Sequence, residues 1–408
     1  MKERNANNKP DRMRPILSSG IFVAALLLCA AMPAIANDGT YYTKGNQLVP
    51  LMETDISVRK EILTISLMDN GYARVDVYYE FWNPGSKTKR LLMGFEADPP
   101  YNDDYKFHPS GAHPNIRNFT VEMNGHRLAC NTAACVRDSL PLQMVDTSKR
   151  YWIFDNNDLY EESNREDEDF PIDIKAGITF SYVYYFNADF QPGLNHVHHT
   201  YTYRMSVVVG IPYLLDYKLT PAARWAGGKI DDFTLIVCAD STAKHFVILE
   251  DAFPEGEFVV SRGVGKIRKT SENPYCSSWS GDNYEFALRN GAVQIHLTDF
   301  HPQNELRIMG MGYNECCDKK GAFHIGATYD RSEPIFFTYN PDKVVPADKA
   351  FLKRVVHNLP YAHRGHVFRD AALRRYFESL WWYMPDPNYK DDTSDFTEAD
   401  WKYIHAEF

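Results

Sequence analysis

EILTISLMDNGYARVDVYYEFW, residues 61–82, is the stretch that decides the fold class. Apolar and polar residues alternate before the dipeptide Asn70-Gly71, and the alternation resumes after it. Because successive side chains of a strand point to opposite faces, each half is typical of a strand with one buried face. Asn and Gly adopt the positive φ angles of a tight hairpin turn at low cost. The stretch therefore predicts an antiparallel hairpin with a buried face that contains Leu63, Ile65, Val75 and Val77.

The same pattern recurs in YEFALRNGAVQIHL, residues 284–297, which predicts a second hairpin around Asn290-Gly291. Residues 178–186 alternate in the same way, and residues 233–237 form a short apolar run, so both are expected to be strands. The 26 Tyr, 24 Phe and 7 Trp also favour strands over a helical bundle. We expect a mainly β protein with an antiparallel, sandwich-like body.

The pattern becomes helical after Pro346. Apolar residues recur at spacings of three and four between residues 347 and 359 and again between 371 and 379. Thr397 and Asp400 resemble a capping pair that opens a last short helix. Four regions are therefore expected. They are a signal peptide (1–36), a β-rich domain (37–190), a second β-rich region that either packs with the first or stands apart (191–342), and a small α-helical domain (346–408).

The N-terminal residues have the pattern of a secretory signal. Residues 1–14 are basic, residues 21–32 read IFVAALLLCAAM, and Ala34-Ile35-Ala36 fits the small-x-small pattern of cleavage. The apolar run is shorter than the roughly 20 residues of a membrane span. Leu28 precedes Cys29, which disfavours a lipid-bearing cysteine. We expect an exported chain that does not span a membrane and works in the periplasm, at the cell surface or after secretion.

The net charge of the mature chain indicates which classes of binding partner are expected. Removal of residues 1–36 takes away five of the 44 basic and two of the 54 acidic residues. The remaining 39 basic and 52 acidic residues give a net charge of −13 with neutral His. Nucleic acids and anionic membranes bind surfaces with clustered positive charge, and this chain is net negative. Neither is therefore expected as the main partner.

Six of the seven cysteines lie beyond the signal pattern. An even number in an exported chain is typical of disulfides, and the alternative is free or metal-binding thiols. Cys130 and Cys135 are expected to close a tight loop. Neighbouring α-carbons lie only ~3.8 Å apart, so adjacent cysteines are expected to pair with distant partners. The disulfide candidates are Cys130, Cys135, Cys238, Cys276, Cys316 and Cys317.

Residues 361–389 read YAHRGHVFRDAALRRYFESLWWYMPDPNY. This segment resembles the YARHG domain, a small module of exported bacterial proteins named after a Tyr-Ala-Arg-His-Gly motif. Here His363-Arg364 stands in the reverse of the family order. Residues 217–237 are more loosely similar to exported bacterial domains of unknown function. The resemblance implies a bacterial cell envelope and brings no reaction with it.

The motif offers candidate ligand contacts, because arginine beside aromatic residues is common in recognition surfaces. The alternative is that a domain of about 60 residues needs its aromatic side chains inside and its polar side chains at helix ends. Gly365 is then expected to adopt a left-handed conformation after the helix. The candidate ligand-binding residues are Tyr361, His363, Arg364, Gly365, His366, Arg369 and Trp382.

LNHVHHTYTY, residues 194–203, offers a candidate metal site through His196, His198 and His199. In a strand His196 and His198 share a face, which suits two ligands of one zinc ion. A third ligand would come from elsewhere, such as His108 or His113. The alternative is a solvated strand edge, and the chain has no His-Glu-x-x-His motif.

An acidic run over residues 155–173 is a candidate for Ca²⁺, although its spacing does not follow the EF-hand loop. The alternative is a solvated loop. No Gly-x-Ser-x-Gly sequence or P-loop is present. These features favour a non-catalytic envelope or secreted protein with a binding role toward an envelope polymer or a protein partner. The alternatives are a metal-assisted hydrolase that uses His196 and His198, and a purely structural envelope component.

Overall fold

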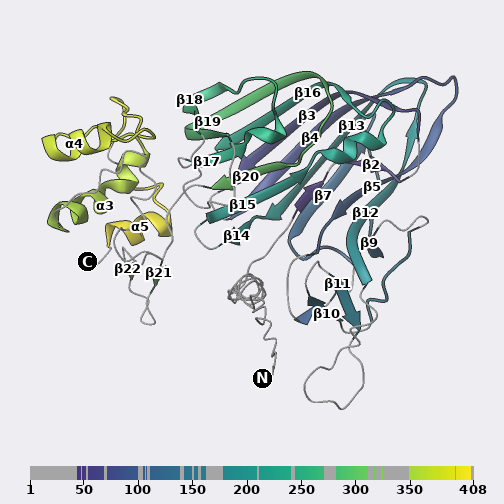
Figure 1. Ribbon diagram of the computed structural model, residues 1–408, viewed down its shortest axis with the longest axis horizontal. Coiled ribbons are helices and arrows are strands. Elements are labelled where there is room, and N and C mark those ends of the chain that lie inside the picture. Colours follow the sequence, from purple (N-terminus) through teal and green to yellow (C-terminus); the bar gives the residue numbers. More distant parts are fainter. Residues whose placement is uncertain are drawn as a thin grey trace, which may run out of the picture. The chain divides into compact units, whose positions relative to one another are not determined.

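Hydrogen-bonded strands make up most of the computed structural model (Figure 1). The strands and three helices belong to one compact unit, Thr40–Phe408. The structure describes residues 44–46, 48–51, 54–68, 71–99, 104–105, 107, 111–137, 142–148, 151–154, 158–161, 178–208, 211–239, 244–270, 282–310, 316–317, 323–324, 349–390 and 392–405.

A 13-stranded sheet is the larger of two main sheets in the described part of the chain. Its neighbouring strands are mostly antiparallel, but β3 with β16 and β1 with β15 are parallel, so the sheet is mixed rather than antiparallel throughout. In spatial order the strands are β1 (Lys44–Asn46), β15 (Ile211–Lys218), β20 (Leu306–Gly310), β17 (Lys244–Leu249), β19 (Asn283–Phe300), β16 (Ile230–Ala239), β3 (Ser57–Leu67), β4 (Tyr72–Asn83), β13 (Gly193–Arg204), β7 (Ile116–Met123) and β8 (His126–Arg127), with β14 (Ser206–Val208) beside β15 and β18 (Val259–Thr270) beside β19.

A second sheet has seven strands within the described ranges, and a further pair, β21 (Cys316–Cys317) and β22 (Phe323–His324), lies apart from both sheets in the pairing. The large sheet takes strands from both 37–190 and 191–342. The strands of the second sheet are β2 (Val49–Pro50), β5 (Lys89–Ala97), β12 (Ile178–Phe190), β11 (Asp158–Glu161), β10 (Tyr151–Phe154) and β6 (Asp104–Tyr105), with β9 (Asn131–Val136) beside β12.

Residues 61–82 form the predicted hairpin, as β3 and β4. Leu63 lies opposite Val77 and Ile65 opposite Val75, and all four side chains are fully buried. Gly71 has the positive φ angle (75°) that the turn requires. The prediction is therefore confirmed for the strands and for Gly71, while Asn70 lies outside the described residues.

The second predicted hairpin is wrong, because residues 283–300 form one continuous strand, β19. The first part of β19 pairs with β17, and the part after Asn290 pairs with β16. Asn290 does take a positive φ angle (56°), and the register with β18 shifts beside it. The Asn-Gly conformation thus makes a bulge where one strand passes from one neighbour to the next, and the chain does not reverse.

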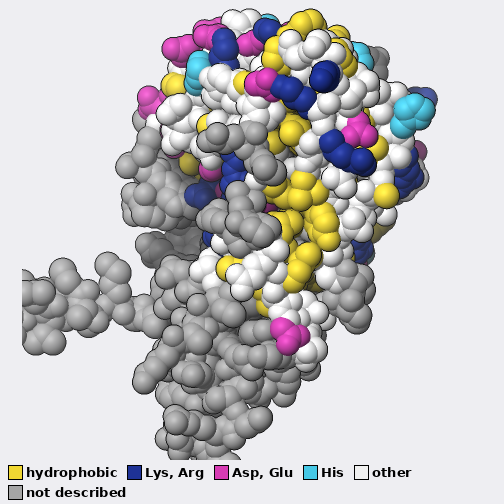
Figure 2. All heavy atoms as spheres, turned by 90° about the vertical axis from the view of Figure 1, so that its right-hand side faces the viewer, with side chains coloured by type: hydrophobic (Ala, Val, Ile, Leu, Met, Phe, Trp, Pro, Cys, Tyr) yellow, Lys and Arg dark blue, Asp and Glu magenta, His cyan; other side chains and the backbone are white. Residues whose placement is uncertain are grey.

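The two main sheets share one hydrophobic core, which confirms the sandwich-like architecture. Phe95 on β5 lies 4.8 Å from Tyr201 on β13 between ring centroids, and Phe81 on β4 lies 5.5 Å from Phe190 on β12. Figure 2 shows one side of the molecule, where hydrophobic side chains form a band with both acidic and basic side chains around it. Short 3₁₀ turns, η2 (Thr220–Arg224) and η3 (Glu250–Ala252), connect strands of the large sheet.

The C-terminal residues form the predicted helices: α3 (Lys349–His363), α4 (Ala371–Glu378) and α5 (Glu398–Ile404). We call residues 349–405 the helical module. It has a hydrophobic cluster of its own, centred on the fully buried Val356 and Phe377. Thr397 and Asp400 form the predicted capping box at the start of α5. Among the described residues, no helix is both long and apolar enough to cross a membrane.

The expected Cys130–Cys135 disulfide is absent, and both residues carry thiols. Residues 131–136 are a strand, and five residues of strand separate two α-carbons by roughly 16 Å, whereas a disulfide needs about 4.4–6.8 Å. Burial raises the pKa of Cys130 to about 12 and that of Cys135 to about 11. Cys238, also predicted to form a disulfide, is a free thiol buried on β16. The side chains of Cys276, Cys316 and Cys317 lie outside the described part of the chain.

Candidate functional site

Strands β4 and β13 pair without interruption over 12 residues and present one face to the exterior. Odd-numbered side chains of both strands, such as Val77 and Tyr201, point into the core. The even-numbered side chains point outward, and we call their surface the β4–β13 face. Its members are Tyr72, Arg74, Asp76, Tyr78, Glu80 and Trp82 on β4, and Leu194, His196, His198, Thr200, Thr202 and Arg204 on β13.

Polar side chains are already joined across this face. The Nδ1 atom of His196 lies 2.7 Å from the Tyr78 hydroxyl, and the two rings are stacked. Tyr78 donates its own proton to Glu80 at 3.0 Å, so His196 is the donor in the first bond. Partial burial and the neighbouring Glu80 raise the pKa of Tyr78. His198 places Nε2 2.8 Å from the Asp76 carboxylate. The two strands thus hold these side chains in fixed positions.

His199 lies on the opposite side of the strand and cannot join His196 and His198 around one metal ion. Its side chain is fully buried, and its ring stacks with Tyr79 and Tyr201. Burial lowers the pKa of His199 to about 3, so the ring is neutral near pH 7. Within the described ranges, no three metal-ligating side chains come together.

His113, proposed as a third metal ligand, is a buried structural residue. Its Nδ1 atom accepts a hydrogen bond from the Asn115 backbone at 3.0 Å, so Nε2 donates to the Asp98 carbonyl at 3.0 Å. Both ring nitrogens are therefore occupied, and burial lowers the pKa of His113 to about 4. His108, and the side chains of the acidic run proposed for Ca²⁺, lie outside the described residues.

Trp82 and Leu194 form an exposed apolar pair at one end of the β4–β13 face. They are direct cross-strand partners, and Trp82 is 39% exposed and Leu194 45% exposed. The Arg59 guanidinium of β3 lies 5.9 Å from the centre of the Trp82 ring. Apolar residues of this size are usually buried, so this exposed pair is a candidate contact surface. The sequence analysis did not single it out, although the period-two pattern places both residues on the outer face.

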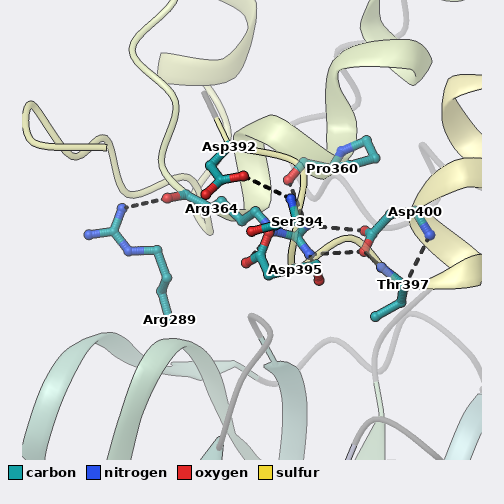
Figure 3. A network of polar contacts seen from close by, with 8 residues as sticks. All are labelled: Arg289, Pro360, Arg364, Asp392, Ser394, Asp395, Thr397 and Asp400. Atoms are coloured by element: carbon teal, nitrogen blue, oxygen red, sulfur yellow. Dashed lines mark hydrogen bonds and ion pairs between the residues drawn. The ribbon is translucent and has the colours of Figure 1, made fainter. Parts of the chain in front are cut away.

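The side chain of Arg364, in the C-terminal motif, bonds to other residues of the helical module (Figure 3). Its guanidinium donates to both carboxylate oxygens of Asp400 at 2.9 and 3.2 Å, and it also bonds to Asp395. Its carbon Cζ lies 4.3 Å from the centre of the Phe396 ring. Burial raises the pKa of Asp400, but hydrogen bonds from Arg364 and Thr397 outweigh it and hold that pKa below its ordinary value. Arg364 therefore joins the end of α3 to the start of α5.

Most of the other candidate motif residues also contact the module itself. The His363 ring lies 4.7 Å from that of Trp382, and burial lowers the pKa of His363 to about 4. Tyr361 packs against Phe396. Gly365 has the predicted left-handed conformation, with φ of 87°. His366 contacts the rings of Tyr361, Phe368 and Tyr389, whereas Arg369 is exposed.

Two cations of the two-sheet region, residues 44–310 and here called the β body, also contact this module. Neither cation was predicted from the sequence. Arg289 on β19 donates to the Arg364 carbonyl, as Figure 3 shows, and also to the Met384 carbonyl. Lys266 on β18 donates to the carbonyls of Trp381 and Tyr383. The motif end of the module is therefore in contact with strands of the large sheet.

Comparison with known families identifies two regions. Residues 353–406 match the family model described as the YARHG domain, and residues 36–151 match one described as a domain of unknown function, DUF4424. The chain therefore carries a YARHG domain at its C-terminal end, which confirms the resemblance seen in residues 361–389. The DUF4424 match lies before residues 217–237, where the looser likeness was noted.

Two solved structures illustrate the more distant likenesses. One is a candidate nutrient binding protein of Legionella pneumophila, which is 18% identical over 90% of this chain and 99% of that chain, with a TM-score of 0.47. The other is an M1 zinc metallopeptidase of Deinococcus radiodurans, 12% identical over 78% of this chain and 56% of that chain, with a TM-score of 0.26. This chain thus spans about half of the metallopeptidase. No curated protein matches the chain in sequence.

Proposed function

We propose that the protein is an exported, non-catalytic binding protein of the bacterial cell envelope, and that its ligand lies on the β4–β13 face. The signal-like N-terminal residues and the YARHG domain support the location. The internal use of Arg364 and His363 supports a ligand surface on the β body instead of the motif.

The observation that carries the proposal is the exposed Trp82–Leu194 pair beside a pre-arranged row of polar groups. Tyr78 and His196 are bonded to each other, as are Asp76 and His198, so little side-chain entropy is lost when a ligand contacts them. The 12-residue pairing of β4 with β13 makes the backbone beneath them rigid. An apolar anchor with fixed hydrogen-bonding groups around it is the usual composition of a recognition surface.

The chemistry of this face fits a polysaccharide chain. The C–H faces of sugar rings are apolar and pack on aromatic rings, while sugar hydroxyls exchange hydrogen bonds with His, Asp and Glu side chains. Trp82 and Tyr78 lie four residues apart on one strand, so their Cα atoms are roughly 13 Å apart, enough to contact successive parts of an extended polymer. The net charge of −13 expected for the mature chain disfavours strongly anionic polymers.

Binding to soluble peptidoglycan fragments and neutral envelope polysaccharides tests the proposal, with affinities measured by calorimetry. Trp82→Ala is expected to weaken binding at least ~10-fold, as loss of a central aromatic anchor does. Trp401→Ala is the matched control, because Trp401 on α5 is also 39% exposed but lies in the helical module. Equal loss in both variants, or unchanged binding by Trp82→Ala, contradicts the proposal. A wild-type protein that binds none of these polymers favours a protein partner or a purely structural role.

A further inference from the structure

Arg289 reaches from the large sheet into the helical module. Its Nη1 atom donates to the Met384 carbonyl at 2.5 Å and lies 3.5 Å from the Arg364 carbonyl, while Nη2 lies 3.5 Å from the Asp386 carboxylate. Only 14% of the Arg289 side chain is exposed. A guanidinium carries five N–H donors in a fixed plane, so one arginine serves several acceptors at once.

Lys266 supplies a second cation to the same part of the module. Its ammonium donates to the carbonyls of Trp381 at 2.8 Å and Tyr383 at 2.9 Å. Lys266 lies opposite Ala287 in the pairing of β18 with β19, two residues from Arg289 along the neighbouring strand. The two cations are therefore presented side by side by one pair of strands.

Trp381 contacts a third cation of the same strands. The Arg268 guanidinium lies 4.4 Å from the centre of the Trp381 ring, within the range of a cation–π contact. Glu285 on β19 fixes Arg268 through a 2.5 Å contact and also bonds to His245 at 2.9 Å. The Trp381 ring is thus placed against a charged group whose own position is set by β17 and β19.

Gly365 leaves the space in the helical module that the Arg289 side chain occupies. A Cβ atom at residue 365 would lie 1.6 Å from Nη1 of Arg289 and 2.8 Å from the Met384 carbonyl oxygen. The glycine is thus required twice, once for its positive φ angle and once for the space that a side chain of the β body occupies. The second requirement is independent of the helix end itself.

The carbonyls of Arg364, Trp381, Tyr383 and Met384 lie together around Gly365, and we call this end of the helical module the carbonyl cradle. We propose that the carbonyl cradle is a receptor for paired cationic side chains from two adjacent β strands. Its occupants in this chain are Lys266 and Arg289. The cradle offers four backbone carbonyls and the Asp386 carboxylate, and no cation of the module is bonded to them in the described structure. Any other ligand of the motif must first displace the two side chains of the β body.

A double-mutant cycle in the full-length protein tests the proposal through melting temperature. Gly365→Ala is expected to lower the Tm, and to lower it less when Arg289 is already Ala, because the clash with Nη1 is then gone. A remaining decrease is expected from the φ angle and the Met384 carbonyl. Arg262→Ala is the matched control background, because Arg262 is an exposed arginine of β18. Equal decreases of the Tm in all three backgrounds overturn the proposal.

Hydrogen exchange provides a readout that does not depend on global stability. Arg289→Ala with Lys266→Ala is expected to raise exchange in residues 364–366 and 381–386 while the core strands β3 and β4 keep their protection. Added ethylguanidinium is expected to restore protection to Arg289→Ala, and ethylamine at the same concentration is not. Unchanged exchange near the cradle in the double variant, or no rescue of Arg289→Ala by ethylguanidinium, contradicts a cation receptor. If the double variant fails to fold, the single variant with ethylguanidinium still decides the question.

Discussion

The guanidinium of Arg364 donates to both carboxylate oxygens of Asp400, at 2.9 and 3.2 Å, and 10% and 12% of the two side chains are exposed. His363 and Arg364 are the two residues at which the motif departs from the order Tyr-Ala-Arg-His-Gly. In this chain the central arginine of the motif is a brace between α3 and α5.

Removal of this brace is expected to destabilise the helical module. Arg364→Ala leaves the Asp400 carboxylate with only its Thr397 contacts, and loss of one partner of a buried ion pair costs about 3 kcal/mol. Urea denaturation followed by the circular dichroism of the helices measures the cost. Arg369→Ala, at an exposed arginine of the same motif, is expected to change the free energy of unfolding by less than ~0.5 kcal/mol. Equal effects of the two variants would contradict a brace.

Stability is expected to fall as the pH falls below about 6.5. Burial holds the pKa of His199 at about 3 and those of His113 and His363 at about 4, from an ordinary value of 6.5. Below pH 6.5 the unfolded chain therefore binds protons that the folded chain does not, and each group costs roughly 1.4 kcal/mol per pH unit at full slope. His199→Phe is expected to reduce this dependence, because it removes the group with the lowest of these pKa values. Chemical denaturation between pH 4 and pH 8 checks the slopes.

Gly71→Val is expected to destabilise the β3–β4 hairpin by about 1 kcal/mol, because a β-branched residue resists positive φ angles. A Cβ atom at residue 71 meets nothing within 4 Å, so the effect isolates backbone conformation from packing. Gly71→Asn is the control, since Asn tolerates this region, and its melting curve should lie close to that of the wild type. A valine variant as stable as the asparagine variant would count against the turn.

Thiol titration measures how many cysteines of the mature protein are free and how many form disulfides. Cys130 and Cys135 are expected to react as free thiols under denaturing, non-reducing conditions. In the native protein at pH 8 their alkylation is expected to be slow, because burial keeps their pKa values near 12 and 11. Cys238 is also a free thiol, so two disulfides are no longer expected. Cys276, Cys316 and Cys317 allow at most one intramolecular disulfide, which would leave four free thiols per chain. Six free thiols would show that the mature chain forms no disulfide.

Truncation after Asp342 tests whether residues 346–408 are a separable domain. The remaining β body is expected to stay soluble, with the circular dichroism of a β protein and a cooperative melt. The truncation uncovers the side of β18 and β19 that contacts Trp381 and Tyr383, where Lys266, Arg268 and Arg289 keep the surface charged. An aggregated product would mean that the helical module completes the core of the β body.

Local patterns were sufficient where a structure depends on neighbouring residues. The alternation around Asn70-Gly71, the Thr397–Asp400 capping box and the left-handed Gly365 all follow from residues a few positions apart. The period-two pattern also separates His199 from His196 and His198, because odd and even positions of a strand face opposite sides. That signal was present in the sequence and did not support a joint site.

Distant pairings were not predictable from the same patterns. The residues around Asn290-Gly291 have the pattern of a hairpin, but whether the chain reverses there depends on β16 and β17. Both strands end more than 30 residues before β19 begins, and they pair with successive parts of β19. Arg289 and Lys266 carried no signal either, because their acceptors are backbone carbonyls, which any residue provides. From the strand sequence alone, Arg289 is predicted to be exposed to solvent. Its contact with the helical module becomes visible only in the structure.

The carbonyl cradle has a consequence for how such modules are exchanged between genes. Recombination that joins this helical module to another protein transfers the carbonyl acceptors of the cradle. It does not transfer Lys266 and Arg289, which donate to those carbonyls here. Backbone carbonyls cannot be removed by substitution, so the new host must supply cations from its own surface or leave the cradle to water. A host that keeps the two strands presenting Lys266 and Arg289 keeps these donors, although 48 residues separate the end of β19 from the start of α3.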